Sequence, residues 1–274
     1  MHESMQYDVV IVGAGPSGLA AAIRLKQQAK QELSVCVIEK AAQIGAHQLS
    51  GAVLEPASLQ MLLPEAWQNA PLDTPVNSDR FYFMSKSRAW RLPTPRQMKN
   101  EGNYIISLGL LCRFLAEQAE ALGCEVYPGF AASDILYNDR GEVIGVATGD
   151  MGIDKEGNKT ANYQPGMHLL GRQTLFAEGC RGHLSQNLIK RFKLNENVQP
   201  QTYAIGLKEV WKVPDAVHKP GTVIHTVGWP LDTATYGGSF IYHYPPPFPT
   251  LKIADSVQIF DLVPNLAPNH LLMG

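Results

Sequence analysis

The chain has 274 residues, which is enough for one large domain or two ordinary ones. Hydrophobic residues make up 45% of it, charged residues 18%, and the formal net charge is −2, so the composition is globular and carries no basic excess for nucleic acid. The polar start has no signal or transit pattern, and no run of about 18 apolar residues would span a membrane.

The first predicted element is a strand that runs directly into a glycine-rich turn. Residues 7–12, YDVVIV, are apolar or β-branched apart from Asp8, as in a parallel strand buried on both faces. Gly13, Gly15 and Gly18 then form a G-x-G-x-x-G pattern that opens an Ala- and Leu-rich helix. The first glycine permits a tight turn, the second lets a pyrophosphate approach the backbone, and the third lets helix and strand pack closely. The pyrophosphate would lie on the free N–H groups of the helix N-terminus.

A second apolar strand, residues 34–40, gives this motif its context. It ends with Glu39, 21 residues after Gly18, where a carboxylate can accept hydrogen bonds from ribose hydroxyls. The pattern therefore predicts a dinucleotide-binding βαβ unit. The acidic residue disfavours the 2′-phosphate of NADP, whereas FAD and NAD both remain possible on this motif alone.

The later segments alternate between helical and extended patterns, with glycine and proline marking the breaks. In chain order we expect a loop over 40–56, a short helix within 55–69, strands over 79–85 and 88–95, a helix over 108–122, a strand and hairpin over 124–149, a loop over 151–166, a strand, turn and helix over 171–192, and strands of a second sheet over 202–213, 221–230 and 237–244.

This order predicts an α/β fold: an FAD-binding Rossmann-like domain of the glutathione-reductase flavoprotein type with an inserted or appended substrate-side β-sheet. We assign residues 1–77 and 100–192 to the FAD-binding domain and residues 78–99 and 200–243 to the substrate-side sheet. Residues 244–274 form an atypical proline-rich tail.

Three further stretches carry a family resemblance: IGAHQLSGAVLEP, FAEGCRGHLSQ and YGGSFIYH. With them, residues 5–243 resemble the electron-transfer flavoprotein:ubiquinone oxidoreductases, also called electron-transferring-flavoprotein dehydrogenases. The resemblance implies an FAD enzyme that takes electrons from reduced electron-transfer flavoprotein. It would pass them through FAD and a 4Fe-4S cluster to ubiquinone, as a peripheral protein on the cytoplasmic face of a bacterial inner membrane or on the mitochondrial inner membrane. Because this is electron transfer, we name no proton-transferring catalytic residue.

The resemblance also implies roles for residues beyond the first motif. Ser50 and Gly51 would lie near the flavin, and Gly179 and Gly182 would form a second glycine turn beside the cofactor. Arg113 resembles an arginine placed against the FAD phosphates, with a solvated helix arginine as the alternative. His47 and His183 lie in loops on the cofactor side, where we favour structural roles.

Two features concern ubiquinone and the membrane. Gly237 and Gly238 correspond to the family's quinone pocket, with a β-bulge or turn as the alternative explanation. The helix near residues 105–122 has an apolar face that could enter a membrane interface. Core packing is the alternative for that face, which consists of Ile106, Leu110, Leu111, Phe114 and Leu115.

The chain departs from the family in two respects. Family members are about twice as long, and their later half brings a G-D motif and the cysteine-rich region that holds the cluster. The four scattered cysteines here, Cys36, Cys112, Cys124 and Cys180, lack Fe–S spacing, so we expect reduced packing thiols, no cluster and no other metal site.

The tail is the second departure. Residues 244–274 hold six of the 19 prolines, which argues against continuing the sheet and suggests out-of-frame translation. Two alternatives to the electron-transfer function stay open. One is a flavin-dependent prenyl reductase or monooxygenase on the same scaffold, and the other is a non-catalytic FAD-binding fragment.

Overall fold

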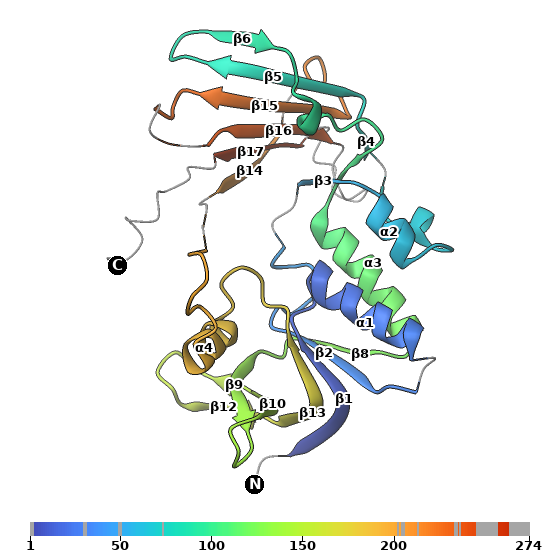
Figure 1. The fold of residues 1–274 in the computed structure, drawn as a ribbon, viewed down its shortest axis with the longest axis vertical. Helices are drawn as coiled ribbons and strands as arrows, with labels where there is room; N and C mark the ends of the chain where they lie inside the picture. The colour runs from blue at the N-terminus through green and yellow to red at the C-terminus, as the bar shows by residue number, and fades with distance from the viewer. Residues whose placement is uncertain are drawn as a thin grey trace. The chain divides into compact units, whose positions relative to one another are not determined.

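The computed structural model describes residues 3–29, 32–48, 51–72, 74–201, 203, 206–212, 214–232, 235, 237–244 and 257–262. The chain divides into two compact units, drawn in Figure 1. The first unit comprises Met1–Gln48 and Gly109–Asn197, and the second comprises Leu49–Leu108 and Val198–Gly274.

A six-stranded sheet forms the centre of the first unit, in the order β8-β2-β1-β13-β10-β9. Its strands pair in parallel from β8 to β13 and antiparallel from β13 to β9. In chain order they are β1 (Ser4–Val12), β2 (Val35–Glu39), β8 (Glu125–Pro128), β9 (Ala132–Tyr137), β10 (Val143–Thr148) and β13 (His168–Phe176). The predicted βαβ unit is therefore present, with α1 (Pro16–Gln28) between β1 and β2.

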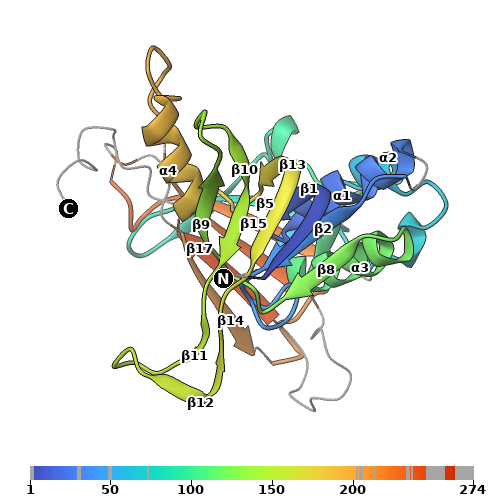
Figure 2. The same cartoon turned by 90° about the horizontal axis from the view of Figure 1, so that it is seen from below.

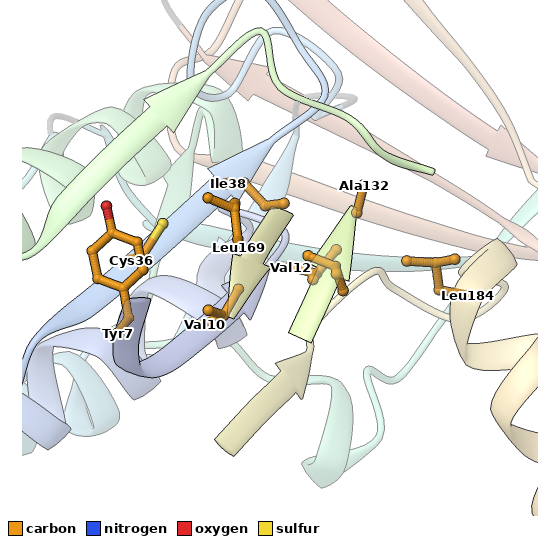
Figure 3. Packing of buried hydrophobic residues seen from close by; sticks show 9 residues of the cluster. Tyr7, Val10, Val12, Cys36, Ile38, Ala132, Leu169 and Leu184 are labelled. Carbon is orange, nitrogen blue, oxygen red and sulfur yellow. The ribbon is translucent and has the colours of Figure 1, made fainter. Parts of the chain in front are cut away.

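Both faces of the parallel strands are buried, as the continuous apolar runs predicted. Val10 and Val12 belong to the core that includes Leu169 of β13 and Leu184 of α4 (His183–Phe192), shown in Figure 3. Alternation sends Ile11 to the opposite face, where α1 packs on β1 and β2. The other helix of this unit is α3 (Leu108–Ala121), which the sequence placed over 108–122.

The expected loop over 151–166 is wrong, because this segment is a β-hairpin. Strands β11 (Met151–Ile153) and β12 (Lys159–Gln164) pair antiparallel with each other and extend from the six-stranded sheet, as Figure 2 shows. The Asp154 carboxylate accepts hydrogen bonds from the backbone N–H groups of Glu156 and Asn158, which closes the turn. The polar composition of the hairpin masked its strands, since neither face is buried.

The second unit contains two antiparallel or mixed sheets. The smaller has the order β3-β7-β4, and the larger has the order β14-β17-β16-β15-β5-β6. Their bounds are β3 (Ala52–Leu54), β4 (Thr74–Pro75), β5 (Ser78–Met84), β6 (Ala89–Leu92), β7 (Tyr104–Ile106), β14 (Leu207–Lys212), β15 (Thr222–Gly228), β16 (Ser239–Tyr244) and β17 (Val257–Leu262). Helix α2 (Ala57–Leu62) and two 3-10 turns, Trp67–Asn69 and Arg96–Met98, connect them.

The division into units differs from the predicted domain boundaries. The sequence assigns residues 49–77 and 100–108 to the FAD-binding domain, whereas they lie in the second unit. The reason is a shared core, in which Val76 and Ile105 pack with Val223 and Tyr242 of the larger sheet. Contacts between residues this far apart in the sequence leave no local pattern, so the boundary could not be read from it.

The tail also differs from expectation. Residues 257–262 form β17, which pairs antiparallel with β14 on one side and β16 on the other. The expectation that the tail does not continue the sheet is therefore wrong for this segment. Its run VQIFDL holds no proline, whereas the prolines lie before it and after it, outside the described residues.

Candidate dinucleotide-binding site

Two of the three motif glycines are required by backbone packing. Gly13 has a φ of 107°, and its N–H donates to the Ile38 carbonyl at 2.8 Å. A Cβ at Gly13 would collide with the carbonyl oxygen of Ala177, and one at Gly18 would collide with the carbonyl oxygen of Gly13. The turn, the helix and the end of β13 therefore approach one another at distances that exclude a side chain.

Gly15 is different, because a side chain there would meet little of the described chain. It is the N-cap of α1 with φ −78° and ψ 179°, and among the described residues a Cβ there would meet only Gln48 Nε2, at 3.5 Å. No side chain caps this helix end, and its first turn carries no acidic residue. The N-terminus of α1 thus presents its backbone N–H groups and the positive end of its dipole to the space above Gly15.

Glu39 is held in one orientation at the end of β2. Its Oε2 accepts a hydrogen bond from the Ala14 N–H at 3.0 Å, and its Oε1 accepts one from the Ala41 N–H at 2.9 Å. The carboxylate is half-buried and keeps further lone pairs for a ligand. These two backbone hydrogen bonds therefore fix the carboxylate that the motif predicts to bind ribose.

A second turn follows β13 and leads into α4. Gly179 has a φ of 84° with open space around it, and Gly182 is the N-cap of α4. Between them and β13 lies Glu178, whose side chain is 9% exposed and accepts hydrogen bonds from the first turn of α4. The sequence interpretation named the two glycines and missed Glu178, although an acidic residue shortly before a helix is a capping signal.

These elements surround one cavity of about 580 Å³ within the first unit. The motif glycines Gly13 and Gly15 line it together with Glu39, and so do the predicted turn residues Gly179 and Gly182. Its basic and imidazole groups are Lys40, His47, Arg181 and His183. The two carboxylates in the lining are both hydrogen-bonded to backbone N–H groups, so the wall offers cations and N–H donors to an anionic ligand.

Other predicted site residues lie elsewhere. Ser50 falls outside the described residues, and Gly51 belongs to the second unit, where it is buried with a φ of 93°. Arg113 is half-buried, and its Nε donates a hydrogen bond to the Ile44 carbonyl at 3.2 Å. Arg113 is not among the residues that line the cavity. Its hydrogen bond joins α3 to the loop after β2.

A close backbone contact in that loop escaped the sequence interpretation. Gly45 has a φ of 80°, and a Cβ there would lie 2.8 Å from the Cα of Gly109 at the start of α3. A Cβ on Gly109 would in turn lie 2.9 Å from the Gly45 carbonyl oxygen. The loop that carries His47 is thus fixed to α3 by a glycine pair and by Arg113.

The predicted quinone residues lie in the second unit, at the start of β16. A Cβ at Gly238 would collide with the carbonyl oxygen of Thr226, and it would lie 3.6 Å from Val227 Cγ1. Gly238 is therefore needed for its close approach to β15. Gly237 precedes it, and both are partly exposed.

The apolar face of α3 packs in the core, which confirms the second of the two alternatives. Leu111, Phe114 and Leu115 are buried, as is Ile106 of β7, and Leu110 is half-buried. Across the part of the chain that the structure describes, no helix combines the length and apolarity needed to cross a membrane.

The four cysteines are free thiols. Burial raises the pKa of the Cys36 thiol to about 12 and those of Cys112 and Cys124 to about 11. Cys180 is exposed and lines the cavity. Among the described residues, no group of three His, Cys, Asp or Glu side chains could hold a metal ion.

Comparison with known proteins supports both units. The family model "ETF-QO, ubiquinone-binding" matches residues 203–259, beyond the expected limit of 243, and "NAD(P)-binding Rossmann-like domain" matches residues 11–59. Among solved structures, a geranylgeranyl bacteriochlorophyll reductase-like protein from Thermoplasma acidophilum superposes with a TM-score of 0.65 at 19% identity. The superposition covers 95% of this chain and 57% of that protein. A flavoprotein/dehydrogenase from Cytophaga hutchinsonii superposes with a TM-score of 0.58 at 16% identity, over 97% of this chain and 56% of that protein. These likenesses confirm the predicted fold class.

Proteins that match by sequence have a much higher identity to this chain. The chain is 56% identical to the mitochondrial electron transfer flavoprotein-ubiquinone oxidoreductase of Arabidopsis thaliana, over 89% of this chain and 39% of that protein. It is 55% identical to the Pseudomonas aeruginosa enzyme of the same name, over 88% and 45%. It is 54% identical to the human protein of the same name, over 86% of this chain and 39% of that protein. The chain thus spans about two fifths of the relatives it matches. The predicted resemblance is confirmed: this chain is similar in sequence to the N-terminal part of the electron transfer flavoprotein-ubiquinone oxidoreductases.

Proposed function

We propose that the first unit binds FAD and that the chain carries the FAD-binding and ubiquinone-binding part of an oxidoreductase. That oxidoreductase passes electrons from reduced electron-transfer flavoprotein to ubiquinone. The observation that carries the proposal is the cavity in which an uncapped helix N-terminus, an open Gly15 and an anchored Glu39 lie side by side. The identity of 51–57% with enzymes of this name supports it.

The residues in the cavity suit FAD. The N-terminus of α1 would hold the pyrophosphate, because Gly15 lets an anion reach the backbone N–H groups. Glu39 would accept hydrogen bonds from the adenosine ribose, since its carboxylate is already turned by Ala14 and Ala41. When bound, the flavin would supply the electron-carrying chemistry, and the protein would bind it, orient it and limit its contact with water.

Ubiquinone is assigned to the second unit. The match to the ubiquinone-binding model spans β14, β15 and β16, and it contains Gly237 and Gly238. Gly238 lets the start of β16 approach β15 closely, at the position that the resemblance gives to the quinone pocket. We place the whole protein at a membrane surface, on the cytoplasmic face of a bacterial inner membrane or in mitochondria, since relatives come from both sources.

A titration of the purified chain with FAD tests the proposal, using flavin fluorescence as the readout. We expect saturable binding that Glu39→Gln weakens about tenfold, because the ribose would lose a charged acceptor. Glu32→Gln, which changes an exposed carboxylate outside the cavity lining, is the matched control and should bind as the unaltered chain does. Absence of binding, or equal effects of both substitutions, would refute the assignment.

A non-catalytic FAD-binding fragment is the second candidate, and the share of the relatives that the chain spans favours it. Electron delivery distinguishes the two candidates. An FAD-loaded chain that accepts electrons from reduced electron-transfer flavoprotein and reduces a short-chain ubiquinone is an oxidoreductase in its own right. A loaded chain that does neither is a binding fragment.

A further inference from the structure

We propose that Glu178 is a positioning residue for the dinucleotide. Its carboxylate shapes the turn over residues 179–182, which forms one wall of the cavity. The same carboxylate directs the diphosphate of the dinucleotide to the N-terminus of α1. The inference rests on the proposed function, because it concerns how the same cavity holds its ligand.

Glu178 is bound to α4 by an extensive set of contacts. Its Oε2 accepts hydrogen bonds at 2.7 Å from both the N–H and the Oγ–H of Ser185. Its Oε1 accepts a longer bond, at 3.3 Å, from the Leu184 N–H and lies 3.4 Å from His183 Nδ1. A carboxylate that accepts several bonds in a site 9% exposed is held in one rotamer. These hydrogen bonds hold Glu178 against Ser185, so the chain between the two residues forms a closed loop.

The shape of the turn depends on this carboxylate. A Cβ at Gly182 would lie 2.5 Å from Glu178 Oε2 and 2.6 Å from its Cδ. Gly182 has an ordinary φ of −61°, so the side chain of Glu178, and not backbone strain, excludes other residues there. Gly179, Cys180 and Arg181 lie between these two fixed points and all line the cavity.

The same contacts decide which helix end receives the anion. Residues at the N-termini of both α1 and α4 line the cavity. In α4, the first-turn N–H groups of Leu184 and Ser185 already donate to Glu178, whose negative charge opposes a second anion. In α1, the N-cap Gly15 has no side chain, and the Glu39 carboxylate bonds the Ala14 N–H, before the helix begins, instead of the N–H groups of its first turn. A diphosphate is therefore directed to Gly15 and α1.

Glu178→Gln tests this role, because it keeps the size of the side chain and removes the charge and one acceptor. We expect FAD binding to weaken by about tenfold to a hundredfold, the loss expected for charge-assisted hydrogen bonds. Ser185→Ala removes only the Oγ contact and should weaken binding less. Val146→Ala is the matched control, since Val146 is fully buried in the same core and lies outside the cavity lining.

The control separates positioning from general stability. Val146→Ala should lower the melting temperature and leave the dissociation constant for FAD unchanged. In Glu178→Gln, backbone amide exchange should also rise at Leu184 and Ser185, which the control should not show. If the unaltered chain binds no FAD, the proposed function fails. If the unaltered chain binds FAD and Glu178→Gln binds it equally or more tightly, the positioning role alone is overturned.

Discussion

Gly15 and Gly18 should respond oppositely to the same added methyl group. In Gly15→Ala, the new Cβ would have, among the described residues, only Gln48 Nε2 nearby, at 3.5 Å, and the backbone is in a region that alanine adopts freely. Replacing a glycine N-cap by alanine lowers the free energy of unfolding by up to about 1 kcal/mol. The smaller conformational entropy of the unfolded chain raises it by about 0.4–1 kcal/mol. The free energy of unfolding should therefore change little. FAD affinity should fall at least about tenfold, because the methyl group occupies the place where the pyrophosphate approaches.

In Gly18→Ala, the new Cβ would collide with the Gly13 carbonyl oxygen and lie 3.2 Å from Ala177 Cβ. Backbone must shift, at a cost of about 1–3 kcal/mol and several degrees of melting temperature. Thermal unfolding followed by circular dichroism, together with FAD titration of each variant, checks both expectations. Unaltered FAD affinity in Gly15→Ala, or unaltered stability in Gly18→Ala, would refute the reasoning about this turn.

Three further predictions concern other parts of the chain. Gly109→Ala should lower the melting temperature, because its Cβ would lie 2.9 Å from the Gly45 carbonyl oxygen, whereas Gly149→Ala has ordinary space and should not. Burial lowers the pKa of His243 below its usual 6.5, with nearby positive groups acting in the same direction. The unfolded chain then binds more protons, so stability should fall as pH drops below about 6.5, less steeply in His243→Gln. Cys180 should react first with a thiol reagent and be protected by FAD, while three buried thiols should react only on unfolding: Cys36, Cys112 and Cys124.

The features that the sequence predicted correctly are those with local causes. The turn at Gly13 and the strand before it follow from short-range sterics and apolar runs, and both are present where expected. The helix over 108–121 follows from composition and a glycine stop at Gly123. These patterns involve residues a few positions apart, so the chain itself displays them.

The features that it missed depend on residues brought together by folding. Val76 joins the second unit because it packs with Val223, almost 150 residues away. Gly45 and Gly109 are far apart in the sequence and come together through the packing of α3 on the loop. Strand β17 pairs with β14 on one side and β16 on the other, although prolines flank its run in the sequence. Such pairings leave no periodicity to read.

The most direct test of FAD binding is the visible absorbance spectrum of the chain after incubation with FAD and gel filtration. We expect a flavin band near about 450 nm to elute with the protein, at one FAD per chain. We also expect this band to be lost in Gly15→Ala while the protein stays folded. A folded chain that elutes colourless, with all of the flavin in the small-molecule fractions, would contradict the assignment of this cavity to FAD.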